Sequence, residues 1–457
     1  MQVYDINGLH IGIDTTDNTA KFYSVSILYN HVFIPRSIKF RNKEYVITKL
    51  VRSFKENCHI DEVEFAEDSE ITTISKKSFY KSSIKSILIP SQIKKIDDFA
   101  FFGCNSLETV NFANNSSLTT ICLQAFAESK IRSITIPSTV QFISKKAFQY
   151  CTYLKSVTFG ADSRLTEISE SLFEKTNLYE ISIPSSVTKI GANAFKFCFR
   201  LQKVSISEES NLQSIGDDAF TSTTIESFYI PSNVSFIGSA SLSAYGTLQT
   251  LKISPKNHNF MIFNDTFLLG KTDFESNEFD LLHVYIQNND NEVTIPSFIK
   301  CISSYSFRRC KQIKSLVFSN DSKIELIENH AFCRSSIERI KIPYNVRIGE
   351  NAFQNCNNLE SIQFFNQNEN QMKKCVIADG LFKDCKKIKF FELLAEEITL
   401  GNEFFSNCNN VLVVSFPNAS KILNGYKAFY FISENVSIFV KFDAEIKEPF
   451  SYIYILE

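Results

Sequence analysis

Hydrophobic residues recur along most of the chain at a fixed spacing that is set by a phenylalanine. This anchoring residue returns after 25 and 22 residues in alternation, so a pair of units occupies 47 residues. Further apolar residues stand eight and five positions before each anchor, as Val140 and Ile143 do before Phe148. A unit offers about six inward residues, and only stacking of units could bury them. The regular anchors are Phe54, Phe79, Phe101, Phe126, Phe148, Phe173, Phe195 and Phe220.

Two kinds of unit alternate, as in FQYCTYLKSVTF (148–159) and FAESKIRSITIP (126–137). The alternation of apolar and polar residues at the end of each predicts a short strand with one face inward. In the second kind the strand should end at Ile-Pro, because proline lacks the N–H that a ladder needs. Segments around the anchor, such as SKKAFQYC (144–151), predict one helical or 3₁₀ turn per unit. The predicted fold class is α/β but mostly β, a solenoid capped at both ends.

The string IPSSVTKIGANAFKFCFRLQKVSI at 183–206 resembles the repeat of the BspA-like leucine-rich-repeat proteins. Such repeats end a strand in Ile-Pro and continue as V-x-x-I-x-x-x-A-F-x-x-C-x-x-L. The resemblance covers roughly residues 46–254 and 293–430. It implies a curved, right-handed leucine-rich-repeat solenoid with a parallel sheet on one face, often a surface antigen or adhesion molecule.

The regions outside the regular units complete the predicted domain organisation. Residues 1–45 lack the repeat and are expected to form an N-terminal β cap, and residues 431–457 a C-terminal cap. Between two arrays of leucine-rich repeats, 46–254 and 293–430, residues 255–292 form an insertion that reads as a small β-meander. Two interpretations of this insertion stay open, a degenerate repeat and a functional protrusion.

Charge and hydropathy narrow the classes of partner. The formal net charge of −2 gives no electrostatic case for binding nucleic acid or an anionic membrane. The N-terminal MQVYDINGLHIGID does not read as a secretory signal, and no run reaches the roughly 18 apolar residues of a membrane span. The sequence therefore predicts a soluble chain and leaves two locations open, the cytoplasm and non-classical attachment to the cell surface.

Candidate catalytic chemistry is sparse. The six histidines are dispersed, and Gly270-Lys271-Thr272 lacks the first glycine of a phosphate-binding loop, so it predicts a hairpin turn. Cysteines recur mostly in alternate units, where strands lie about 9.6 Å apart, too far for the roughly 7 Å that a disulfide allows. They are expected to be small apolar fillers inside the coil. We therefore expect no enzyme, no cofactor and no metal. The cysteine ladder is Cys58, Cys104, Cys151, Cys198, Cys310, Cys356, Cys385 and Cys408.

The outward positions of the predicted strands suggest where a partner would bind. Most carry serine or threonine, and the departures are Tyr229, Lys252, Arg339 and Lys341, which flank the insertion. Tyrosine and arginine are favoured at binding hot spots, so these four are the candidate partner-binding residues. The first functional hypothesis is a protein-binding or adhesion scaffold, and the second is an intracellular scaffold or regulator. An enzyme is the remote third, and neither the partner nor the oligomeric state follows from the sequence.

Overall fold

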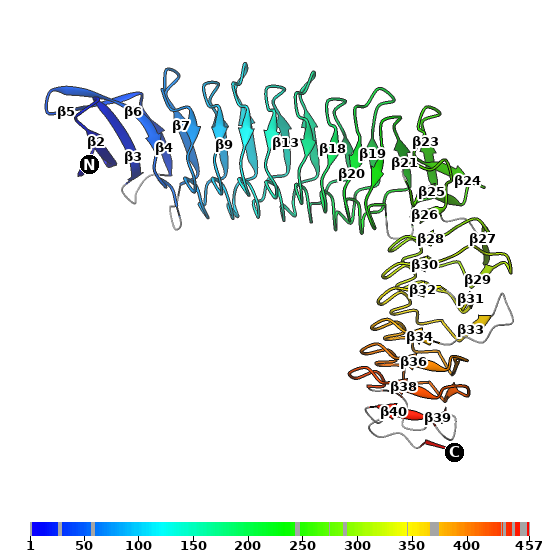
Figure 1. Cartoon of the computed structure of the whole chain (residues 1–457). Coiled ribbons are helices and arrows are strands. Elements are labelled where there is room, and N and C mark those ends of the chain that lie inside the picture. Colours follow the sequence, from blue (N-terminus) through cyan, green and yellow to red (C-terminus); the bar gives the residue numbers. More distant parts are fainter. Residues whose placement is uncertain are drawn as a thin grey trace. The chain divides into compact units, whose positions relative to one another are not determined.

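A computed structural model provides the structure of the chain (Figure 1). It describes residues 2–25, 30–55, 60–242, 247–273, 275–286, 290–344, 346–365, 374–430, 432, 436–440, 444–447 and 455–456. These fall into two compact units. The first lies within Met1–Ala244 and Lys252–Asn257, and the second within Tyr245–Leu251 and His258–Glu457.

The first unit begins with a five-stranded sheet of order β1-β2-β3-β6-β5, in which only β3 and β6 pair in parallel. Phe22 of this sheet is fully buried, and its ring lies 5.4 Å from that of Phe54, the first anchor. Residues 26–29, which follow β3, lie outside the described residues. The strands are β1 (Gln2–Ile6), β2 (Leu9–Asp14), β3 (Thr19–Val25), β5 (Ser37–Phe40) and β6 (Lys43–Leu50).

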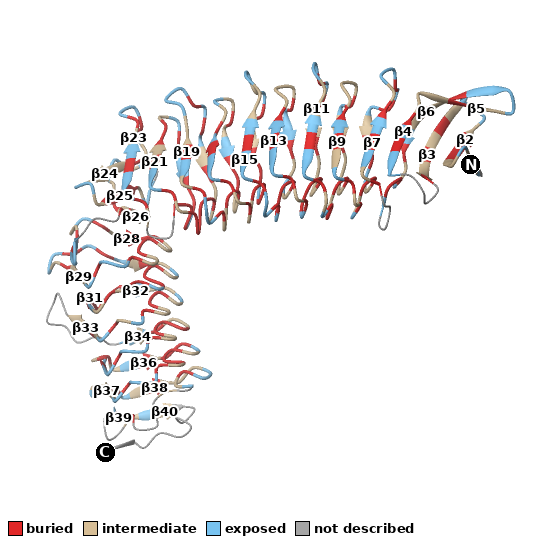
Figure 2. Cartoon of the chain, turned by 180° about the vertical axis from the view of Figure 1, so that it is seen from behind, coloured by how far each residue is buried: buried red, intermediate tan, exposed pale blue. Residues whose placement is uncertain are grey.

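Each following coil contributes one longer strand to a parallel ladder, as the pattern L-x-x-V-x-F predicts. The first ladder consists of β4 (His31–Ile34), β7 (Glu62–Phe65), β9 (Ser86–Ile89), β11 (Thr109–Phe112), β13 (Ser133–Ile136) and β15 (Ser156–Phe159). The second consists of β17 (Glu180–Ser182), β19 (Lys203–Ser205), β21 (Ser227–Ile230) and β23 (Thr250–Ile253). In register, Thr109 stands beside Ser86 and Ser133. Figure 2 shows buried and exposed residues alternating along these strands, so one side chain in two points outward.

A second ladder of two-residue strands runs through the same coils, and the sequence analysis did not predict it. These strands hold the apolar residue five positions before each anchor, such as Ile143 before Phe148. They are β8 (Thr73–Ile74), β10 (Lys95–Ile96), β12 (Thr120–Ile121), β14 (Phe142–Ile143), β16 (Glu167–Ile168), β18 (Lys189–Ile190), β20 (Ser214–Ile215) and β22 (Phe236–Ile237).

The second unit repeats this arrangement after an antiparallel start, because β25 pairs antiparallel with both β24 and β26, and β26 then pairs in parallel with β28. Its first short-strand sheet holds β24 (Met261–Phe263), β25 (Phe267–Gly270), β26 (Leu281–Tyr285), β28 (Cys301–Ile302), β30 (Leu326–Ile327) and β32 (Arg347–Ile348). A further one holds β34 (Lys374–Val376), β36 (Glu397–Thr399), β38 (Lys421–Leu423) and β40 (Glu445–Lys447). The long strands are β27 (Glu292–Ile295), β29 (Ser315–Phe318), β31 (Arg339–Pro343), β33 (Ser361–Phe365), β35 (Phe390–Glu392), β37 (Val413–Phe416), β39 (Ser437–Val440) and β41 (Ile455–Leu456).

The anchoring phenylalanines form a column of stacked rings in the core of the first unit, which confirms the repeat frame. From Phe54 to Phe220 the centroids of successive rings lie 4.8 to 5.7 Å apart, with interplanar angles of at most 20°. Every anchor in this column is fully buried. The second unit has its own column, which runs through Tyr285, Phe307, Phe332, Phe353, Phe382 and Phe405.

The prediction of a helical or 3₁₀ turn at each anchor is wrong, and with it the α part of the fold class, since no described residue lies in a helix. In the coil of Phe148 the residues two before and two after the anchor, Lys146 and Tyr150, have φ values of 62° and 61°. This left-handed conformation interrupts a right-handed helix. The N–H groups of Lys146, Phe148 and Tyr150 instead donate to carbonyls of the next coil, at 3.0, 3.1 and 2.9 Å. The turn thus forms a third hydrogen-bonded ladder between coils.

Candidate functional site

Two of the predicted partner-binding residues lie on neighbouring strands of the first unit. Tyr229 is half-buried on β21, and Lys252 is exposed on β23, the next strand of the same sheet. The N–H of Ser254, just after β23, donates to the carbonyl of Ile230 at 2.9 Å. The main chain therefore holds these two outward positions in adjacent rungs.

The other two predicted residues lie on a single strand of the second unit. Arg339 and Lys341 are both exposed on β31 and stand two residues apart, so they share its outward face. Their register partners on β33 are Ser361 and Gln363. The four predicted residues thus form two pairs, one pair in each compact unit.

A hollow of about 660 Å³ lies over β11 and β13. Its side chains are mostly hydroxyls and amides, among them Asn111, Asn115 and Thr139. The carboxylate that lines it, Glu108, accepts two hydrogen bonds from the guanidinium of Arg132, each 3.0 Å long. The side-chain hydrogen bond to Arg132 lowers the pKa of Glu108. This hollow can therefore form hydrogen bonds with neutral polar groups, while its carboxylate, Glu108, is already paired with Arg132.

The ladder cysteines are buried, as predicted, but they are more than apolar fillers. The Sγ of Cys104, Cys151 and Cys198 each donates to the carbonyl of the anchor in the preceding coil, at 2.9, 3.0 and 3.0 Å. Coils of the other kind place serine or threonine at this position, and Thr176 donates to the carbonyl of its own anchor at 2.9 Å. The cysteine thus adds a further hydrogen bond to a main-chain carbonyl that already accepts one within its own turn, as the carbonyl of Phe173 does from the N–H of Thr176 at 3.2 Å. Cys58 lies outside the described residues.

Burial makes the thiols of Cys104, Cys151 and Cys198 poor nucleophiles and poor metal ligands. It raises the pKa of Cys104 and Cys198 to about 12 and that of Cys151 to about 11. The thiolate is the reactive and metal-binding form, so at neutral pH these side chains remain protonated. These side chains contribute packing and a hydrogen bond to the fold, and they are not reactive thiolates at neutral pH.

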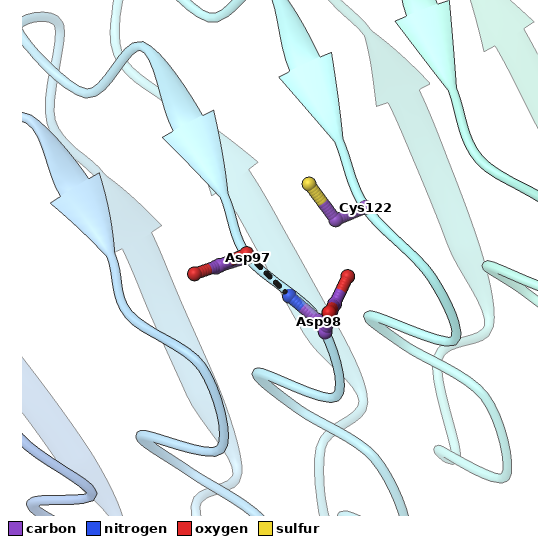
Figure 3. A group of neighbouring side chains, drawn as sticks. All are labelled: Asp97, Asp98 and Cys122. Atoms are coloured by element: carbon purple, nitrogen blue, oxygen red, sulfur yellow. Dashed lines mark hydrogen bonds between the residues drawn. The ribbon is translucent and has the colours of Figure 1, made fainter.

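One group of side chains among the described residues has the composition of a metal site. The ligand atoms of Asp97, Asp98 and Cys122 lie within 4.8 Å of one another (Figure 3). Both carboxylates already have partners, since Lys95 lies 3.0 Å from Asp97 and Lys76 lies 3.3 Å from Asp98. Burial also raises the pKa of Cys122 to about 11. The group is better described as a charge-compensated polar cluster at the edge of the short-strand ladder.

The Gly270-Lys271-Thr272 triplet begins at the last residue of β25 and leads into the connection to the antiparallel strand β26, which confirms the predicted hairpin. Both the N–H and the hydroxyl of Thr272 donate to the carboxylate of Asp280 at 2.9 Å, and Lys300 lies 3.0 Å from the same carboxylate. Burial alone would raise the pKa of Asp280, but the hydrogen bonds from Thr272 and Lys300 outweigh it and lower that pKa. Thr272 of the triplet therefore stabilises the connection between β25 and β26 through its hydrogen bonds to Asp280.

Sequence reasoning missed a group of aromatic and cationic side chains on the segments that lead from the anchor turn to the long strand. Exposure here reaches 56% for Tyr179 and 52% for Phe199. The strings FQYCTYLK, FEKTNLYE and FKFCFRLQ contain these aromatic residues. They lie before the long strand, outside the outward strand positions from which the partner-binding residues were predicted. We name this group the aromatic edge; it consists of Tyr150, Tyr153, Tyr179, Phe197 and Phe199 with Lys130, Lys155, Lys175 and Arg200.

The stacked parallel ladders and the anchor columns define a leucine-rich-repeat solenoid. The family model described as "BspA type Leucine rich repeat region (6 copies)" matches residues 31–155, 119–249, 166–277, 283–411 and 375–453. The chain therefore belongs to the BspA-type leucine-rich-repeat family.

Solved structures show the same fold. A leucine-rich cell surface protein from Faecalibacterium prausnitzii is similar with a TM-score of 0.56 and 20% identity, over 96% of this chain and 94% of that one. A leucine-rich-repeat protein from Bacteroides ovatus gives a TM-score of 0.53 and 17% identity, over 97% and 99% of the two chains. Comparison with curated protein sequences finds no match. Among the described residues, no helix has the length and apolarity that crossing a membrane requires.

Proposed function

We propose that this protein is a non-catalytic scaffold that binds a partner protein along its solenoid surface. The observation that carries the proposal is the register of the long strands. Residues that alternate outward, such as Thr109, Ser133 and Ser156, stand side by side in consecutive coils and are exposed. The coil core does not use these side chains, so they are available to a partner over many rungs.

On the strand face we propose Tyr229 with Lys252 and Arg339 with Lys341 as partner contacts. Each pair breaks a surface of small hydroxyl side chains with an aromatic or cationic group. Such groups supply the contact area and charge-assisted hydrogen bonds that hot spots need. The similar Faecalibacterium prausnitzii chain is a cell surface protein, and we propose an adhesive, surface-exposed role for this chain as well.

The test begins with a partner isolated by crosslinking to the full chain. Its affinity for the native protein is then compared with that for the Tyr229→Ala, Arg339→Ala and Ser156→Ala variants. We expect the first two to weaken binding by at least about fivefold and the third to leave it unchanged. Equal affinity of all three variants, with folding intact, contradicts the proposed contacts. Protease treatment of intact cells that carry a tagged chain tests the location, and full protection of the tag contradicts a surface role.

We also propose that the N-terminal sheet caps the first unit. Its support is the packing of Phe22 against Phe54 and two hydrogen bonds to the carbonyl of Phe22. The N–H of Val51 donates to it at 2.8 Å and the hydroxyl of Ser53 at 2.9 Å. An uncapped solenoid end exposes apolar surface and unpaired main chain. The boundaries 1–45, 46–254, 255–292, 293–430 and 431–457 remain our proposed division of the chain.

A further inference from the structure

The aromatic edge spans consecutive coils of the first unit. The Nζ of Lys175 lies 4.6 Å from the ring centroid of Tyr150 in the preceding coil and 5.5 Å from that of Phe197 in the following coil. The rings of Phe197 and Phe199 are 5.8 Å apart, and the Nζ of Lys130 lies 5.8 Å from the ring of Tyr153.

Main-chain hydrogen bonds fix the spacing of the same coils. The N–H of Tyr179 donates to the carbonyl of Lys155 at 3.4 Å, and the N–H of Gln202 donates to the carbonyl of Tyr179 at 2.9 Å. Tyr179 therefore stands between the other members of the edge rather than apart from them.

The coil itself does not require aromatic residues at these positions. Four residues after the anchor, where Phe199 stands, other cysteine-containing coils have Asn105, Asn357 and Asn409. One residue further on, where Tyr153 stands, Ser106, Asn358 and Asn410 are found. These coils have the same buried anchor, so the core forms equally well with small polar side chains. The exposed rings thus add apolar area to the surface at positions where the coil does not require an aromatic residue.

The charge of the edge is positive. Among the described residues, no carboxylate lies within salt-bridge distance of Lys130, Lys155, Lys175 or Arg200, while Lys130 lies close enough to Glu108 for a coulombic attraction. Of two nearby carboxylates, Glu108 forms a salt bridge with Arg132, and Glu174 accepts a hydrogen bond from the uncharged amide of Gln149 at 2.7 Å. An approaching partner therefore meets exposed rings set among positive charges.

We propose that the aromatic edge binds an acidic, aromatic- or apolar-containing segment of a partner protein. This inference rests on the proposed function of the chain as a protein-binding scaffold and names the chemistry of the partner. Carboxylates of the segment pair with Lys155, Lys175 and Arg200, and its apolar side chains pack on Tyr179 and Phe199. Aromatic residues and arginine are the types enriched in protein interfaces.

A nucleic acid fits the edge less well. Binding of nucleic acid is dominated by phosphate contacts, and specific complexes commonly use about six to ten of them. The edge supplies four cations that form no salt bridge among the described residues, in a chain whose formal net charge is −2. The exposed rings give a protein segment apolar contact area that does not depend on a phosphate backbone.

The test measures binding of the full chain to a labelled peptide of alternating glutamate and tyrosine by fluorescence anisotropy. The matched neutral peptide has glutamine in place of glutamate. We expect the acidic peptide to bind at least about fivefold more tightly than the neutral one and to weaken as salt screens the charges. The edge variants copy residues that other coils carry: Tyr153→Asn, Phe199→Asn and Lys175→Asn. Asparagine suits Lys175 because Asn355 and Asn407 occupy that position with φ values of 60° and 61°.

Each edge variant should weaken binding of the acidic peptide by at least about fivefold. The matched controls are Phe142→Thr and Phe236→Ser, which remove rings that are 47% and 48% exposed on the short-strand ladder. Their register partners are Thr120 and Ser214, so the coil accepts these side chains too. The controls should bind the peptide as the native chain does.

Several results overturn the inference. Equal binding of the acidic and neutral peptides, or equal losses in edge and control variants, removes the charged-edge explanation. Tighter binding of an oligo-dT strand or dextran sulfate, abolished by the same edge variants, assigns the edge to another polyanion. If native and edge-variant chains capture the same crosslinked partner equally well, the edge is not the contact while the scaffold function stands. If the native chain captures no protein at all, the proposed function fails, and the peptide comparison still decides the chemistry of the edge.

Discussion

Replacing one ring in the middle of the anchor column is the sharpest test of how the coils hold together. Phe148 is fully buried between Phe126 and Phe173, with ring centroids at 5.3 and 5.7 Å and interplanar angles of 3° and 15°. Truncation of a buried phenylalanine to alanine costs about 3–5 kcal/mol. An interior ring also loses two stacked neighbours, each of which contributes about 0.5–1.5 kcal/mol. We therefore expect Phe148→Ala to lie in the upper half of that range, at about 4–5 kcal/mol.

Urea unfolding followed by far-ultraviolet circular dichroism measures this loss. Because each coil contacts only its neighbours, a weak coil in the middle of the array should also split the transition and lower its m value. Tyr150→Asn is the matched control, since Tyr150 lies two residues away, is 38% exposed and has a left-handed φ that asparagine accepts. We expect the control to cost less than about 0.5 kcal/mol. A loss below about 1 kcal/mol for Phe148→Ala, or equal losses for both variants, would refute the stacked column as the source of stability.

Three further predictions concern buried or half-buried titratable groups. Cys104, Cys151 and Cys198 should remain unlinked to one another in native protein prepared without reductant, and any disulfide among them in mass mapping contradicts the coil spacing. Because burial raises the pKa of each thiol, the three should react with iodoacetamide only after unfolding. Asp280→Ala should cost about 2–3 kcal/mol at pH 7, where it leaves the N–H of Thr272 without its acceptor. Because hydrogen bonding lowers the pKa of Asp280 below 3.8, this loss should persist down to about pH 4 and shrink below it, and a loss that is constant down to pH 2 contradicts the assignment. Burial lowers the pKa of His283 from 6.5 to about 4, so protonation of the unfolded chain should reduce stability by up to about 2 kcal/mol between pH 7 and pH 5; His283→Asn should remove that part of the pH dependence, and an unchanged profile contradicts it.

The repeat frame could be predicted from the sequence because stacking imposes the same requirement on every coil. Residues such as Phe148 and Ile143 must be apolar in each unit, since no coil can bury them alone. The long strands followed from the alternation after the anchor, and the Ile-Pro ends followed from the missing N–H. In β13, for example, the strand ends at Ile136 and Pro137 follows.

The turn and the short strands could not be predicted in this way. Lys146 and Tyr150 adopt left-handed φ values, although neither residue type is typical of that conformation. Their N–H groups find acceptors only in the next coil, which lies 24 residues further along the chain. The short strands of the first unit, such as β14, have two residues each, too few to show a period. Both features depend on contacts between coils, and no local pattern records them.

The candidate site could be predicted less well than the fold, because its residues stand at positions that the packing of the coil does not constrain. Tyr229 is a single aromatic residue among small outward side chains such as Ser182 and Ser205 on its own sheet. The aromatic edge concentrates five rings in consecutive coils, at positions where other coils carry polar residues such as asparagine, serine or glutamate. Since exposed apolar area is unfavourable unless a partner covers it, the denser cluster has more to gain from binding. We therefore expect the loss of affinity for a crosslinked partner to be larger for Tyr179→Glu, which copies Glu226 and Glu338 of equivalent coils, than for Tyr229→Ala. The reverse order would place the main contact on the strand face.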